Sequence, residues 1–196
     1  MGWIVLFGMP VLSAQVPNQK PTREKQKRAL EIVSISVWRK WLNEDVAYII
    51  TDQERGDFAT LTSEQQRDQF ITDFWERRNP NPGSPENAFK DEHYRRFAYA
   101  NEHFATKLPG WKTNRGRIYI IYGPPDQVDN HFSAAGSESA ERILGAGAIP
   151  YDWELWHYRY IDGVGKNVAI KFVDTCACGE YQIPVEKKDL KKYTPQ

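Results

Sequence analysis

Apolar residues recur at helical spacing in the first part of the chain. Between Arg23 and Trp41 they include Leu30, Val33 and Val37, each three or four positions from the next. Residues at this spacing share one face of a helix. The pattern predicts a first helix over 23–41.

Two capping signals predict where the next helices begin. Thr51 stands three residues before Glu54, and Thr62 stands three residues before Gln65. In such a box each side chain satisfies a backbone N–H that the first helical turn leaves free. The helix that follows Thr62 is expected to run to about Arg78. Its buried stripe is expected to contain Phe70, Ile71, Phe74 and Trp75.

A further helix is predicted from Ser84, as its cap, to about Thr106. Pro85 suits the first helical position, where a missing N–H does no harm. The expected apolar face consists of Phe89, His93, Phe97, Ala100 and Phe104. On this face His93 is interpreted as a core histidine, with a ligand or catalytic role as the alternative.

The second half of the chain carries strand patterns. The runs at 117–122, 151–160, 167–174 and 181–185 are rich in aromatic and β-branched residues and are bounded by turn residues. Residues 126–150 are polar and glycine-rich and are expected to form a long loop. Helices first and strands afterwards predict an α+β fold, with N-terminal helices packed on a C-terminal antiparallel β-meander.

The two ends of the chain differ from its middle. Residues 1–16 carry no charge and are mostly apolar, with small residues before Gln15, which is typical of a secretory signal. Residues 187–196 form a basic tail, and no later segment is apolar enough to cross a membrane. We therefore expect export to the periplasm or the extracellular space. The formal net charge of zero argues against nucleic acid as a partner.

One segment concentrates candidate binding residues. Arg115 and Arg117 flank Gly116 at the start of the predicted strand 117–122, and Asp126 and Asp129 follow it. One interpretation is a joint between a helix and a strand whose residue types are set by backbone geometry. The other is a polar pocket, with the arginines binding an anion and the acids lining its rim.

Metal and catalytic patterns are weak. Asp126, Asp129 and His131 are ligand types for a divalent metal, but their spacing matches no calcium loop, so we predict no metal site. We find no nucleophile elbow, P-loop or dinucleotide fingerprint, and we expect no cofactor. Cys176 and Cys178 have three open interpretations: two thiols in a turn, a local disulfide, or a metal or redox site.

The run from Gly110 to Asp126 (GWKTNRGRIYIIYGPPD) resembles the signature of the GWxTD domain family, and the likeness extends over about 37–185. The family implies an exported bacterial protein and no established activity. Asn114 stands where the family usually has Asp, and Asn79 stands where an Asp after Arg-Arg is usual. Asn keeps the shape of Asp and its turn-forming hydrogen bonds but removes the charge.

These patterns together predict four segments. They are a signal-like segment at 1–16, an extension and helix start at 17–36, a GWxTD-like domain at 37–186 and the tail at 187–196. The function we expect is a module that binds a protein or a cell-envelope component. The alternatives are a hydrolase-type enzyme with a polar site at the joint, and a structural subunit of a larger envelope complex. The candidate binding residues are Arg115, Arg117, Asp126, Asp129 and His131.

Overall fold

The computed structural model describes residues 22–132 and 151–184. The signal-like segment, the basic tail and most of the expected loop at 126–150 lie outside this range. The chain divides into two units, Met1–Val37 and Trp38–Gln196, and the second holds the sheet and most of the helices. No helix in the described residues has the length and apolar character that crossing a membrane requires.

The fold is α+β, as predicted: within the described residues, five α-helices precede a three-stranded antiparallel sheet in the order β1-β2-β3. The α-helices are α1 (Arg23–Lys40), α2 (Asp52–Thr60), α3 (Glu64–Glu76), α4 (Ala88–His103) and α5 (Asn114–Tyr122). A π-helical turn, Trp41–Asp45, follows α1, and a 3-10 turn, Gly110–Lys112, precedes α5. The strands are β1 (Gln127–His131), β2 (Asp152–Ile161) and β3 (Gly165–Asp174).

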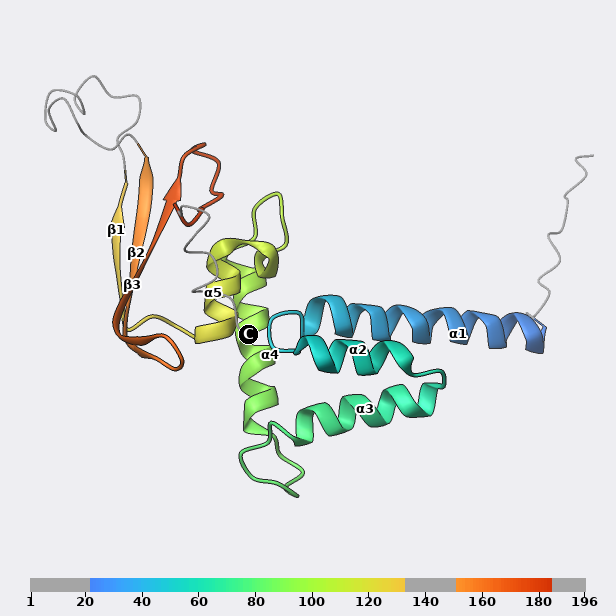
Figure 1. The fold of residues 1–196 in the computed structure, drawn as a ribbon. Coiled ribbons are helices and arrows are strands. Elements are labelled where there is room, and N and C mark those ends of the chain that lie inside the picture. Colours follow the sequence, from blue (N-terminus) through green and yellow to red (C-terminus); the bar gives the residue numbers. More distant parts are fainter. Residues whose placement is uncertain (1–21, 133–150, 185–196) are drawn as a thin grey trace, which may run out of the picture. The chain divides into compact units, whose positions relative to one another are not determined.

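Side chains of the second unit form two core clusters. The first lies where the π-helical turn, α2 and α3 meet, and its ring pairs include Trp41 with Phe74 and Phe58 with Phe70. The second lies where α4 and α5 pack on β2 and β3, with Phe104 and Phe172 both against the ring of Trp156. Figure 1 shows α2 beside α3, and α5 between α4 and the sheet.

Several helix starts follow the sequence, and two are displaced. Thr51 and Glu54 form the predicted capping box at α2. The box at α3 is one residue later than predicted, because Ser63 and Gln66 make the reciprocal hydrogen bonds. Helix α4 begins at Ala88 and not near Ser84, because the amide of Asn87 accepts the Lys90 N–H and caps it. It also ends at His103, three residues before the expected end.

The predicted strand at 117–122 is wrong, because these residues belong to helix α5. Thr113 caps this helix by accepting the Gly116 N–H, and Ile118, Tyr119 and Ile120 are all buried. A run that is apolar on every side has no readable period, so its β-branched residues favoured the wrong element. Tertiary packing overrides that local preference.

The loop expected from residue 126 is also partly wrong, because β1 occupies 127–131 and pairs with β2. The polar sequence of β1 has no strand pattern, and its contacts with β2 hold the strand in place. The predicted strands at 151–160 and 167–174 are confirmed as β2 and β3, with an antiparallel turn between them. The strand expected at 181–185 is reduced, within the described residues, to one bridge between Val173 and Gln182.

A charged network joins the start of α2 to the end of α3. Glu54 accepts hydrogen bonds from Arg77 and Arg78, and Arg78 also donates to the carbonyls of Phe74 and Ile49. Burial alone would raise the pKa of Glu54, but the hydrogen bonds from Arg78, Thr51 and Arg77 outweigh it and lower the pKa to about 2.

This network predicts a dependence of stability on pH. A lowered carboxylate pKa adds stability above the unfolded-state value near 4.5, and this stability is lost as the pH falls toward about 2. We expect Glu54→Gln to be less stable than the wild type at pH 7 and to approach it in acid. Urea unfolding across this pH range measures the difference, with the exposed Glu86→Gln as the control. Parallel wild-type and Glu54→Gln curves would contradict the prediction.

Candidate functional site

The GWxTD-like segment forms a tight joint between α4 and α5. A Cβ on Gly110 would lie 1.8 Å from the carbonyl oxygen of Ala100, and one on Gly116 would lie 1.9 Å from the carbonyl oxygen of Gly110. Both partners are backbone atoms that a side-chain rotation cannot move. Glycine is therefore required at both positions by close approach of the backbone.

Trp111 fixes the joint to the helices around it. Its backbone N–H donates to the side chain of Asn101, and its carbonyl accepts the hydroxyl of Tyr48. Its ring stacks on Phe97 of α4 at 6.0 Å between centroids and meets Tyr48 edge-on. The aromatic residue of the signature thus has both backbone and ring partners, and its role in the structure is packing.

Arg115 connects the joint to the sheet. Its guanidinium donates to Glu154 of β2 at 2.7 Å, and both side chains are largely buried. It also donates to the Gly179 carbonyl at 3.4 Å and lies 4.0 Å from the centroid of the Tyr181 ring. The second carboxylate oxygen of Glu154 accepts the indole N–H of Trp156. Arg115 is therefore a clamp between the joint and the sheet, with both terminal nitrogens of its guanidinium donating within the protein.

The two asparagines at the family's acidic positions occupy turn and cap sites. Asn79 is buried, accepts the Asn81 N–H and donates through its amide to the Ser84 carbonyl. Asn114 is the first residue of α5, directly after the Thr113 cap. An acid at a helix start interacts favourably with the helix dipole. The residue types at both positions can therefore be explained by their structural roles, without a catalytic role.

The face of the sheet that points away from α5 carries a different set of polar groups. His157 of β2 lies 2.8 Å from Asp129 of β1, and the hydrogen bonds that Asp129 accepts from Gln127 and His157 lower its pKa. Asp126, just before β1, accepts the backbone and side-chain N–H groups of Arg159, and these hydrogen bonds lower its pKa. These side-chain pairs help to set the register of β1 on β2.

Aromatic contacts continue along the same face. The ring of His131 stacks on Trp153 at 5.4 Å, and the ammonium of Lys171 from β3 lies 5.1 Å from the Trp153 centroid. His131 is paired with Trp153, and Trp153 with Val173, in the strand register. One indole therefore links all three strands on this face.

The five predicted binding residues do not converge on one pocket. Arg115 reaches Glu154, whose neighbours in the register are Asn130 and the fully buried Phe172, so it lies on the helix side of the sheet. Asp126, Asp129 and His131 make their contacts with Arg159, His157 and Trp153. Arg117 lies near Tyr48, where its charge opposes the rise that burial causes in the pKa of the tyrosine hydroxyl.

The residues that sequence reasoning missed are the partners on β2. Glu154, His157 and Arg159 lie in the run 151–160, and the alternation of side chains along a strand sets His157 and Arg159 on one face. What the sequence did not reveal was the register that sets Asp129 beside His157, because β1 itself was not recognised. The residues on β2 can therefore be identified from the sequence, but their partners lie in or next to β1, in a segment that was expected to be a loop.

Among the described residues, two surface hollows are considered as sites. One, of about 410 Å³, lies at the Asp126 end of the sheet and is lined by Gln127, His157, Arg159 and Asn167 as well. An Asp–His pair can orient a general base, but this lining includes no serine, threonine or cysteine to act as nucleophile.

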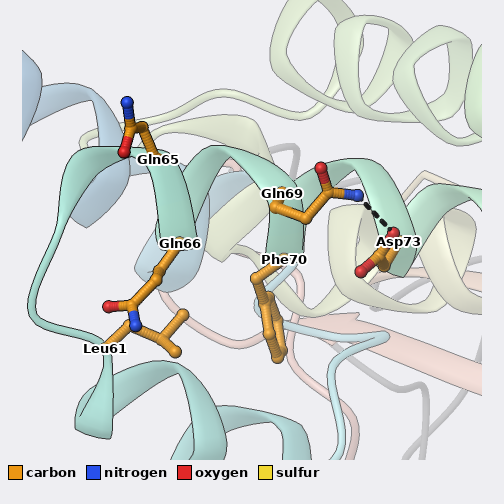
Figure 2. Close-up of a pocket in the computed structure, with 6 residues that line it drawn as sticks. All are labelled: Leu61, Gln65, Gln66, Gln69, Phe70 and Asp73. Atoms are coloured by element: carbon orange, nitrogen blue, oxygen red, sulfur yellow. Dashed lines mark hydrogen bonds between the residues drawn. The ribbon is translucent and has the colours of Figure 1, made fainter.

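The second hollow, of about 500 Å³, lies on α3. Figure 2 shows Leu61, Gln66 and Phe70 around it. The side-chain amide of Gln69 donates a hydrogen bond to the carboxylate of Asp73. The lining of this hollow offers apolar contacts, side-chain amides and one carboxylate, that of Asp73, which Gln69 already engages.

The cysteine turn follows β3. Cys176 and Cys178 form a disulfide, so of the three interpretations of the sequence the two free thiols in a turn are wrong and the local disulfide is confirmed. Asp174, Cys176 and Cys178 place potential ligand atoms within 4.8 Å of one another, but the two sulfurs are bonded to each other. This arrangement therefore does not present thiolates to a metal.

The glycine constraint at the joint can be tested directly. We expect Gly110→Ala to lose roughly 3 kcal/mol or more of unfolding free energy, because the new Cβ overlaps a backbone carbonyl. Gly56→Ala in α2 is the matched control, since its Cβ would meet nothing within 4 Å and alanine favours a helix by up to about 1 kcal/mol. Urea unfolding measures both. A Gly110→Ala variant as stable as the wild type would contradict the close approach.

Comparison with known proteins gives one family match. The model of the GWxTD domain matches residues 34–135, which is just over half of the 196 residues and includes the joint, α2 to α5 and β1. Neither a comparison with curated proteins nor one with solved structures finds a match. The chain belongs to the GWxTD domain family.

Proposed function

We propose that this GWxTD domain protein is a binding module that takes up an extended segment of a partner protein by strand addition along β1. The observation that carries the proposal is that β1 is an edge strand of the sheet. The core cluster under the sheet takes its strand residues from β2 and β3. Val128 of β1, paired with the buried Trp156, is 40% exposed.

An edge strand of this kind is a template for another chain. Within the described residues no strand pairs with the second edge of β1. Such an edge presents backbone N–H and C=O groups that can bond to an added strand. Proteins commonly protect edges with Lys or Pro inside the strand, and the sequence of β1 (QVDNH) contains neither.

The side chains at this edge indicate the chemistry of the partner. Val128 and Phe132, the latter 72% exposed, offer apolar contacts next to the edge. The charges of Asp126 and Asp129 are already engaged by Arg159 and His157. The expected partner is therefore an extended protein segment with apolar side chains at alternate positions, held mainly by main-chain hydrogen bonds.

The proposal includes a location outside the cytoplasm. It is supported by the apolar, uncharged residues 1–16 and by the Cys176–Cys178 disulfide, since disulfides persist in oxidising compartments.

The test is capture of the partner by the tagged full chain from its own cell envelope fraction, followed by three variants. We expect Val128→Lys and Phe132→Lys each to reduce capture roughly tenfold or more, because a lysine on the edge opposes strand addition. Tyr160→Lys is the matched control. Tyr160 is an exposed aromatic residue near the end of β2 that does not pair with β1. Its capture is expected to be unchanged.

Hydrogen exchange of the complex then locates the contact. Strand addition predicts slower exchange of the β1 amides in the bound state, because their outer N–H groups gain partners. Capture that survives Val128→Lys, or protection confined to other elements, would sink the β1 proposal. Recovery of the native protein only from the cytoplasm would refute the proposed location.

A further inference from the structure

The disulfide after β3 has features that a structural crosslink does not need. It joins residues only two positions apart, and both Cys176 and Cys178 are exposed. A disulfide stabilises a fold mainly by closing a loop in the unfolded chain, and the gain falls as the loop shortens. A bond across one intervening residue therefore adds little to the stability of the fold.

The turn is held by other groups. The carboxylate of Asp174, only 4% exposed, accepts backbone N–H groups from Cys176, Cys178 and Gly179. Arg115 of the signature joint donates to the Gly179 carbonyl at the end of the same turn. These contacts do not require the sulfur–sulfur bond, so the two cysteines stay close together when it opens.

The residue between the two cysteines has an unusual backbone conformation. Ala177 has φ of +50°, in the left-handed region that residues with a Cβ rarely adopt. Ala177 is the one residue inside the ring that the disulfide closes. Exposed sulfurs, a short loop and a pre-formed turn are together typical of a disulfide that exchanges with other thiols. They are not typical of a structural crosslink.

We propose that Cys176–Cys178 is a thiol–disulfide exchange site that oxidises a dithiol in another protein or peptide. A thiolate of the dithiol attacks one sulfur, the Cys176–Cys178 bond breaks, and the departing sulfur takes up a proton. The second thiol of the donor then attacks the mixed disulfide, loses its proton and releases the other cysteine as a thiol. Two electrons and two protons pass to the turn, and the donor leaves as a disulfide.

The position of Asp174 selects the sulfur that is attacked. Its Oδ1 lies 3.2 Å from the sulfur of Cys176. In the transition state the negative charge of the attacking thiolate is shared with the departing sulfur, where it grows, and the sulfur between them carries least of it. A departing thiolate at Cys176 would face this carboxylate, so Cys178 departs and Cys176 carries the mixed disulfide.

The first experiment mixes the oxidised full chain with a reduced synthetic peptide that contains two cysteines. Thiols are then alkylated and both species are weighed by mass spectrometry, which is unambiguous because the chain has only two cysteines. We expect the chain to gain two labels while about one equivalent of peptide becomes oxidised. The double variant Cys176→Ser, Cys178→Ser is expected to oxidise none. A wild-type disulfide that stays intact under these conditions would overturn the proposal.

Two further measurements separate exchange from a structural role. Reduced and oxidised chains are expected to unfold at nearly the same temperature, whereas a large drop on reduction would identify a structural crosslink and contradict the proposal. Asp174→Asn keeps an acceptor for the turn and removes the charge, so we expect its first exchange step with glutathione to be roughly threefold to tenfold faster. An unchanged or slower rate in a folded Asp174→Asn variant would overturn the proposed influence of the Asp174 charge on the exchange.

Discussion

The contact between Gly110 and the carbonyl of Ala100 is the constraint on which the rest of the structure depends. It lets the 3-10 turn lie directly on α4, and Gly116 then lets α5 turn back against Gly110. With α5 in this position, Arg115 reaches Glu154 and the sheet is held against the helices. The glycine, tryptophan and threonine of the family signature thus have packing and capping roles, which accounts for a signature without an evident catalytic group.

The sequence predicted elements where one face of the pattern is polar. Helices α2 to α4 and strands β2 and β3 have caps, alternation or turn glycines that can be read locally. Helix α5 could not be read, because Ile118, Tyr119 and Ile120 are buried on all sides and lose the helical period. Strand β1 could not be read for the opposite reason, since it is polar and its stability comes from β2, far along the chain.

The candidate site shows the same limit. Residue types and spacing identified Arg115, Asp126, Asp129 and His131 as chemically notable, and each has a specific partner in the structure. Their division between the two faces of the sheet depends on the register of β1, which no local pattern encodes. The cysteine pair was identified as a turn with open chemistry, and the acceptor role of Asp174 became visible only with the backbone in place.

The measurement that tests this account most directly is a double-mutant cycle on Arg115 and Glu154, followed by urea unfolding. If α5 clamps the sheet through this pair, Arg115→Met and Glu154→Gln each lose roughly 2–4 kcal/mol, because each leaves a buried partner unsatisfied. The double variant then loses less than the sum by more than about 1 kcal/mol. Losses that add to within about 0.5 kcal/mol would show two independent residues and would contradict the clamp.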